Sequence, residues 1–170
     1  MRKLLVFVKL IFCASVIHAQ SEEDKRWLLW ERLPDWSATA LKSLKLDSLY
    51  SISDFINPYY LEADFNGDNK IDIAIAVEQV RTKKKGFLIV HQSGKKYFVV
   101  GAGKEFGNGG DDFNWMDVWK VYTDKKIGPG VGEKNPVALK MKAILVAKSE
   151  SSSAVIYWTG DKYQWYHQGD

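Results

Sequence analysis

Hydrophobic residues recur at every second position in the middle of the chain, at Ile71, Ile73, Ile75 and Val77. The residues that alternate with them are Asp72, Ala74, Ala76 and Glu78. A period of two predicts a β-strand, because alternate side chains of a strand share one face, whereas a helix brings together residues three and four apart. We therefore expect the four branched side chains to point to one side of a strand and into the core.

Further short hydrophobic runs predict the rest of a sheet. These runs are rich in β-branched and aromatic residues and are bounded by turn-forming residues. The expected strands cover residues 59–61, 87–91, 97–100, 143–147, 154–159 and 163–167. With the central strand they make six or seven strands, which short connections favour as antiparallel neighbours.

The last two expected strands are joined by the pair Gly160-Asp161, a good two-residue turn. This turn would pair Trp158 with Tyr163 and Ile156 with Trp165. Aromatic rows of this kind either stack on sugars, anchor an interface or belong to the core. The core is the preferred interpretation for this chain.

The segment before the sheet has helical spacing instead. Residues 21–33 carry large apolar side chains at Trp27, Leu28, Trp30 and Leu33. Pro34 ends this helix, and Asp35 can cap a second one. The predicted fold class is therefore α+β, with N-terminal helices packed on a mostly antiparallel sheet.

Oxygen-bearing residues occupy alternate positions in the loop just before the central strand. Asp64, Asn66, Asp68 and Asp72 stand at positions 1, 3, 5 and 9, and Lys70 at position 7 would contribute its backbone carbonyl. Hard cations such as Ca²⁺ bind six to eight oxygens, and this spacing supplies several of them from one tight loop. The sequence therefore predicts a calcium site in this loop. The alternative is a turn rich in Asp, Asn and Gly that holds no ion.

This order of loop and strand resembles the calcium loop of integrin-type FG-GAP and VCBS repeats. The resemblance rests on the pattern D-x-N-G-D-x-x-x-D followed by I-A-I-A-V, and it extends more faintly over residues 63–100. In those repeats the ion braces the turn that enters a blade strand of a β-propeller, so the resemblance implies a propeller-blade-like calcium loop. Asn69 replaces the usual glycine, and Ile75 at position 12 excludes an ordinary EF-hand, which has a glutamate there. The chain is too short for a complete propeller, so the motif belongs to a smaller fold or to a partial set of blades.

The first twenty residues have the features of a secretory signal. A basic start with Arg2 and Lys3 precedes an apolar run over residues 4–17, which is too short for a comfortable membrane span. We expect residues 1–20 to be a signal peptide and residues 21–170 to form a single domain. The product would be secreted or periplasmic, with no transmembrane segment after removal of the signal.

The single cysteine offers a lesser alternative, a lipid anchor at Cys13. Phe12 precedes it, whereas bacterial lipoproteins have a small residue there, so lipidation is disfavoured. Cleavage at the expected site would remove Cys13, so the exported chain would have no disulfide and would depend on packing and on a metal ion.

The charge of the mature chain is balanced. The predicted signal holds three basic and no acidic residues, so its removal leaves 21 Lys and Arg against 21 Asp and Glu. Nothing in this balance favours nucleic acid as a partner. The lysine run 83–85 is expected to be a solvated turn, with a cationic membrane patch as the alternative.

Residues 101–119 form the least regular stretch, with five glycines within ten residues. Long glycine-rich loops are often functional, because ordering them is costly in backbone entropy. Asp111, Asp112, Trp115 and Asp117 are its candidate ligand-binding residues. The spacing does not match a phosphate-binding loop. A loop that closes over the core, with solvated aspartates, is the preferred interpretation.

No catalytic motif is present, and no catalytic residue is predicted. The chain lacks H-E-x-x-H and G-x-S-x-G, and His91 and His167 both lie in expected strands. The function that we expect is an exported, calcium-stabilised binding or structural domain without enzymatic activity, with a protein or a glycan as partner. The alternative is a small secreted hydrolase that uses the aspartates of the 101–119 loop.

Overall fold

The computed structural model describes residues 24–93, 96–130 and 135–169. The predicted signal peptide lies outside these ranges. Contacts divide the chain into two units, residues 1–33 and 34–170. In the first unit residues 24–31 are helical. The second unit holds every strand.

The predicted α+β class is wrong. Of the described residues 39% lie in strands and 16% in helices, and the strands form several antiparallel sheets rather than one sheet beneath helices. The first sheet has five strands: β1 (Tyr50–Ile52), β2 (Tyr60–Ala63), β3 (Asp72–Gln79), β4 (Lys85–Val90) and β5 (Tyr97–Gly101). The second sheet has four: β6 (Val118–Tyr122), β9 (Ala143–Ala147), β10 (Ser153–Trp158) and β11 (Tyr163–Gly169). A two-stranded ribbon is formed by β7 (Lys126–Ile127) and β8 (Val137–Ala138).

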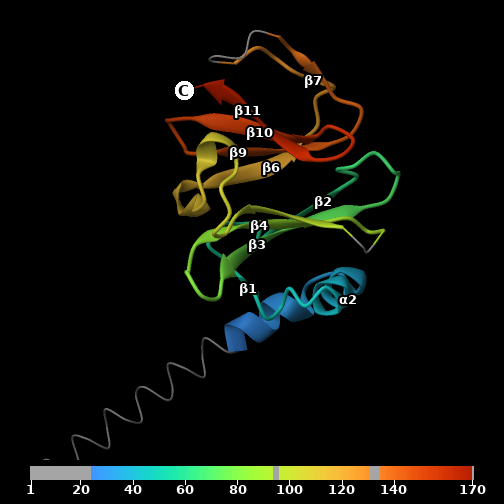
Figure 1. The fold of residues 1–170 in the computed structure, drawn as a ribbon, viewed down its shortest axis with the longest axis vertical. Helices are drawn as coiled ribbons and strands as arrows, with labels where there is room; N and C mark the ends of the chain where they lie inside the picture. Colours follow the sequence, from blue (N-terminus) through green and yellow to red (C-terminus); the bar gives the residue numbers. More distant parts are fainter. Residues whose placement is uncertain (1–23, 94–95, 131–134, 170) are drawn as a thin grey trace, which may run out of the picture. The chain divides into compact units, whose positions relative to one another are not determined.

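The two larger sheets are antiparallel meanders that stack on each other (Figure 1). In the first sheet β3, β4 and β5 follow in order, while β2 pairs with the start of β3 and β1 with its end. In the second sheet the order is β11-β10-β9-β6. One hydrophobic cluster joins the facing sides, where the rings of Phe87 and Trp119 lie 5.3 Å apart. The second unit is therefore a β-sandwich.

Strand β3 confirms the predicted strand and the burial of three of the four branched side chains, but not that of Ile71. Ile73, Ile75 and Val77 are buried on one of its faces, whereas Ile71 precedes the strand and is 48% exposed. Ala74 and Ala76 are buried on the opposite face, in the cluster between the sheets. Small side chains on that face leave room for the large residues of the facing sheet.

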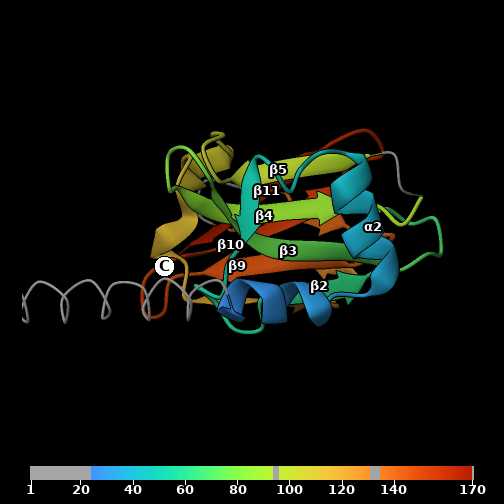
Figure 2. The same cartoon turned by 90° about the horizontal axis from the view of Figure 1, so that it is seen from below.

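The outer faces of both sheets are covered. Helix α2 (Asp35–Ser43) runs along the outer side of the first sheet and buries Ala40 and Leu41 (Figures 1 and 2). The ribbon of β7 and β8 covers the second sheet, where Ile127 packs with Val155 and Tyr166. Because both faces of each sheet are covered, few strands show a regular alternation of hydrophobic and polar residues in the sequence.

The C-terminal hairpin has the predicted register. Ile156 pairs with Trp165 and Trp158 pairs with Tyr163. Tyr163 and Trp158 are 6% and 8% exposed, and Trp165 packs against the same cluster. The aromatic row therefore belongs to the core between the sheets.

Candidate metal-binding loop

The loop that joins β2 to β3 is closed by its own side chains. Asp64 Oδ1 accepts hydrogen bonds from the backbone N–H groups of Gly67 (2.6 Å) and Asp68 (3.2 Å), and Oδ2 accepts from that of Asn69 (2.9 Å). Gly67 and Asn69 adopt left-handed backbone angles, with φ of 84° and 62°. These are residue types that tolerate this conformation, so the sequence permits the tight turn.

Two further side chains tighten the middle of the loop. Asn66 Oδ1 accepts from the Asp68 N–H at 2.8 Å, and Asp68 Oδ1 accepts from the Lys70 N–H at 2.9 Å. Bonds across two residues are typical of Asx turns. Asp64, Asn66 and Asp68 therefore present their oxygens on a short, ordered piece of backbone.

Asp72, the last residue of the loop pattern and the first of β3, is fully buried. Its Oδ2 accepts from the Phe65 N–H and its Oδ1 from the Gln92 N–H, both at 3.0 Å, and Oδ1 also faces Asn66 Nδ2 at 3.5 Å. Burial raises the pKa of Asp72 to about 6; the two N–H bonds oppose this shift, and the nearby charges of Asp68 and Asp64 add to it. An uncompensated carboxylate at this position therefore costs free energy, which a cation would offset.

The donor chemistry of this loop fits a hard cation. Three carboxylates and an amide supply oxygen ligands from one segment, and an oxygen that accepts a single hydrogen bond keeps a lone pair for an ion, whereas Asp64 Oδ1, which accepts two, does not. Among the described residues no three His, Cys, Asp or Glu side chains come close enough to hold a metal by themselves. The carboxylates of Asp64, Asp68 and Asp72 therefore do not converge as a group of three in this structure, and a calcium site on the loop would need them to move together and to be joined by the Asn66 amide, the Lys70 carbonyl and water.

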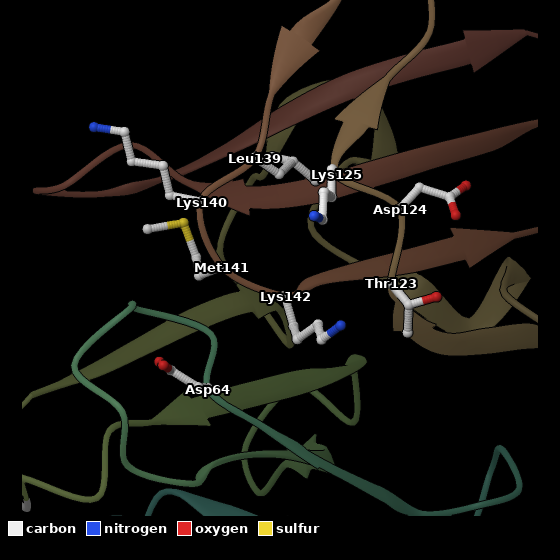
Figure 3. Close-up of a pocket in the computed structure, with 8 residues that line it drawn as sticks. All are labelled: Asp64, Thr123, Asp124, Lys125, Leu139, Lys140, Met141 and Lys142. Atoms are coloured by element: carbon white, nitrogen blue, oxygen red, sulfur yellow. The ribbon is translucent and has the colours of Figure 1, made fainter.

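The loop lies against the segment that leads into β9. The Lys142 N–H donates to the backbone oxygen of Asp64 at 3.1 Å. A Cβ built on Gly67 would lie 3.0 Å from Met141 Cε. Figure 3 shows the Asp64 carboxylate on the side of the loop that faces Met141. Glycine at position 67 is favoured mainly by its left-handed backbone, since the methyl end of Met141 could shift slightly for a larger residue.

A cavity of about 290 Å³ opens between these two segments (Figure 3). It is lined by Asp64, Thr123, Asp124, Lys125, Leu139, Lys140, Met141 and Lys142. A second cavity of about 520 Å³ begins on the other side of Met141. It is lined by Asn66, Ala138, Lys140, Met141, Tyr157, Trp158, Thr159 and Gly160. The sequence gives no local signal for these cavities, because each is lined by three separate segments: residues 64, 123–125 and 139–142 for the first, and residues 66, 138–141 and 157–160 for the second.

The aspartates of the glycine-rich loop do not converge. Asp111 forms an ion pair with Lys84, and Asp112 Oδ1 accepts from the N–H groups of Lys85 (2.9 Å) and Asn114 (3.1 Å). Each of these carboxylates stabilises the connection between β5 and β6. Two residues of the lysine run, Lys84 and Lys85, thus contact the glycine-rich loop. The third, Lys83, forms an ion pair with Glu78.

Asp117 has separate partners at the start of β6. Its Oδ2 lies 2.8 Å from Lys148 Nζ, and its Oδ1 accepts from the Ser149 N–H at 2.7 Å. These bonds, the Lys148 bond first, lower the pKa of Asp117 to about 2. Trp115 donates from Nε1 to the Gly109 carbonyl at 2.9 Å. The four ligand candidates of this stretch thus have structural contacts in different places.

The glycines of this stretch permit close packing. A Cβ on Gly107 would lie 2.4 Å from Trp165, and one on Gly109 would lie 2.6 Å from Phe113. Gly107 also has a φ of 54°. The loop therefore closes over the core on two aromatic rings, but its aspartates are paired or hydrogen-bonded rather than solvated as expected.

His91 belongs to a buried aromatic cluster. Its Nε2 lies 2.9 Å from the Tyr163 hydroxyl, and its ring packs against Phe98 and Trp158. Burial lowers the pKa of His91 and raises that of Tyr163. The pair satisfies two polar groups inside the core and connects the end of β4 to β11.

Comparisons with known proteins give no match that bears on this site. The chain matches no protein-family model, no curated protein and no solved structure. In the ranges that the structure describes, no helix has the length and apolar character that a membrane span requires.

Proposed function

We propose that this chain is an exported binding domain whose β2–β3 loop holds a calcium ion that stabilises the fold. The observation that carries the proposal is the bonding of residues 64–72. The side chains of Asp64, Asn66 and Asp68 accept hydrogen bonds from the backbone of the loop. The buried Asp72 accepts a hydrogen bond from Phe65 at the start of the same loop. Asp64, Asn66, Asp68, Asp72 and the carbonyl of Lys70 would hold the ion.

The ion would act on stability rather than on a reaction. In the absence of a cation, burial disfavours a negative charge on Asp72, and the charges of Asp68 and Asp64 add to this effect. Calcium offsets this repulsion, and it binds only where the loop is folded. At a free concentration one hundred times the dissociation constant, binding of this kind stabilises the native state by about 2.7 kcal/mol.

Asp72 also connects the loop to the rest of the first sheet. It accepts from the N–H of Gln92, in the turn between β4 and β5. An ion on the loop would therefore fix two neighbouring turns at the same end of the sandwich. A protein or a glycan is the partner class that we propose.

Calorimetric titration tests the calcium site directly. We expect CaCl₂ added to EDTA-treated protein to bind with one ion per chain, and Mg²⁺ to bind more weakly because it demands stricter geometry. Asp68→Ala should abolish the heat of binding, whereas Asp54→Ala, at an exposed position outside the loop, should leave it unchanged. Absence of binding at millimolar calcium, or equal binding by Asp68→Ala, would overturn the proposal.

Export has its own test. The intact mass of the protein recovered outside the cytoplasm should lack residues 1 to about 20, as expected for a cleaved signal. Recovery of the full-length chain there would contradict the proposed signal peptide.

A further inference from the structure

Two methionines lie in the ranges that the structure describes, and their surroundings differ. Met116 belongs to the hydrophobic cluster between the sheets and is 2% exposed. Met141 lies just before β9, is partly exposed, and lines each of the cavities beside its segment, including the one drawn in Figure 3. Small molecules in solvent therefore reach the Met141 thioether, whereas that of Met116 is enclosed by the core.

Met141 also lies against the loop of residues 64–72. A Cβ built on Gly67 would lie 3.0 Å from Met141 Cε and 3.7 Å from Met141 Cβ, so the Met141 side chain lies next to this position of the loop. The next residue, Lys142, donates its N–H to the backbone oxygen of Asp64 at 3.1 Å. Met141 packs in addition on the hydrophobic cluster between the sheets. Its apolar side chain thereby joins the loop to the core.

We propose that Met141 is a site of oxidation by peroxides, and that formation of its sulfoxide loosens the loop of residues 64–72. In the reaction with hydrogen peroxide the sulfur attacks one oxygen atom, so that an S–O bond forms and the O–O bond breaks. The other oxygen leaves as water after it takes the proton of the attacked oxygen. The sulfur is oxidised by two electrons and the peroxide is reduced by two, so no further co-reactant is needed.

The sulfoxide fits this position less well than the thioether does. Oxidation makes a flexible apolar side chain polar, which disfavours its contact with the hydrophobic cluster. It also adds an atom to a side chain that already lies close to Gly67. The ionised carboxylate of Asp64, which lines the same cavity, offers the new oxygen only acceptor atoms. The loop should therefore separate from Met141, and this effect goes beyond the proposed function because it does not need a bound ion.

The first test locates the oxidation. The full chain is treated with hydrogen peroxide and digested, and the mass gain of one oxygen is followed in the peptides that hold each methionine. Met141 should be oxidised at least about tenfold faster than Met116, because the reagent reaches Met116 only when the core opens. In urea the two rates should become similar. Equal rates in the folded protein, or faster oxidation of Met116, would overturn the inference.

The second test measures the effect on the loop, with EDTA present. The backbone N–H groups of residues 67–70 donate to side chains within the loop, so their hydrogen exchange reports its opening. Oxidised wild type should exchange faster at these amides, and it should melt about 2 °C or more below the untreated protein. Treatment with methionine sulfoxide reductases that act on both sulfoxide epimers should restore both values.

Two matched variants assign the effect to one residue. Met141→Leu keeps a similar volume without the sulfur, so peroxide should change neither its exchange nor its melting temperature. Met116→Leu retains Met141 and should respond to peroxide as wild type does. Complete oxidation of Met141 with unchanged exchange at residues 67–70, or an equal peroxide response in Met141→Leu, would overturn the inference.

Because these measurements are made without calcium, their outcome is independent of the proposed function. A peroxide effect in EDTA, in a protein that does not bind calcium, would support the role of Met141 and reject the calcium loop. Calcium binding by a protein whose loop does not respond to oxidation of Met141 would support the calcium loop and reject this inference.

Discussion

The buried carboxylate of Asp72 accepts a hydrogen bond from the backbone N–H of Gln92, twenty residues further along the chain, at 3.0 Å. Its other oxygen accepts from the N–H of Phe65 at the same distance. One side chain thereby connects the β2–β3 loop to the β4–β5 turn. This connection makes the loop part of the fold, independently of any ion.

Removal of this carboxylate should therefore destabilise the protein even without metal. Asp72→Ala leaves the buried N–H of Phe65 without its acceptor, which costs about 1–3 kcal/mol, whereas the N–H of the exposed Gln92 can bond to water. We expect urea unfolding in EDTA to show a loss of at least about 1 kcal/mol. Asp54→Ala, at an exposed position, should change stability by less than about 0.5 kcal/mol. A loss for Asp72→Ala no larger than that of the control would refute the anchoring role.

The packing of the glycine-rich loop predicts different costs for two glycines. Gly107 and Gly110 both have positive φ, of 54° and 74°, but only Gly107 lies against Trp165. Gly110→Ala should cost about 1–3 kcal/mol through backbone strain alone, because its φ of 74° and ψ of −159° lie in a region that is almost restricted to glycine. Gly107→Ala should cost about 1–3 kcal/mol more, because the new methyl group must displace the indole. Denaturant unfolding measures both, and equal losses would show that the loop does not close on Trp165.

The hydrogen bonds of the Asp117 carboxylate should contribute to the stability of the fold at neutral pH and not in acid. Its bonds to Lys148 and Ser149 lower its pKa to about 2, below the ordinary value. A carboxyl with a lowered native pKa stabilises the fold above its unfolded pKa of about 3.9, and the contribution is lost as pH falls towards 2. The stability difference between wild type and Asp117→Asn should be constant from pH 7 to pH 5 and should shrink between pH 4 and pH 2. A difference that does not change over this range would contradict the ion pair.

The strongest local patterns of the sequence predicted the strands correctly. The alternation in residues 73–77 and the turn at Gly160 are decided by neighbouring residues, so β3 and the pairing of Trp158 with Tyr163 were found. The fold class was wrong because β1, β6, β7 and β8 are short or irregular and carry no periodic signal. Without β6, the second sheet could not be recognised as a separate layer. Strand pairing between distant segments is decided by tertiary packing, which one sequence does not display.

Some features of the candidate site could likewise be predicted from neighbouring residues, and others could not. The spacing of Asp64, Asn66 and Asp68 located the β2–β3 loop, because all its members lie in one turn. The burial of Asp72 and its bond to Gln92 depend on the neighbouring hairpin and had no local signal. The cavity beside Asp64 had no local signal either, since residues 123–125 and 139–142 line it together only in the folded chain.

The measurement that tests the central claim most directly is a thermal melt with calcium and with EDTA, on wild type and on Asp68→Ala. Calcium at one hundred times its dissociation constant should stabilise wild type by about 2.7 kcal/mol, which raises the melting temperature by several degrees. Asp68→Ala should melt at the same temperature in both solutions. A wild-type melting temperature that does not change on chelation would show that residues 64–72 form only a turn.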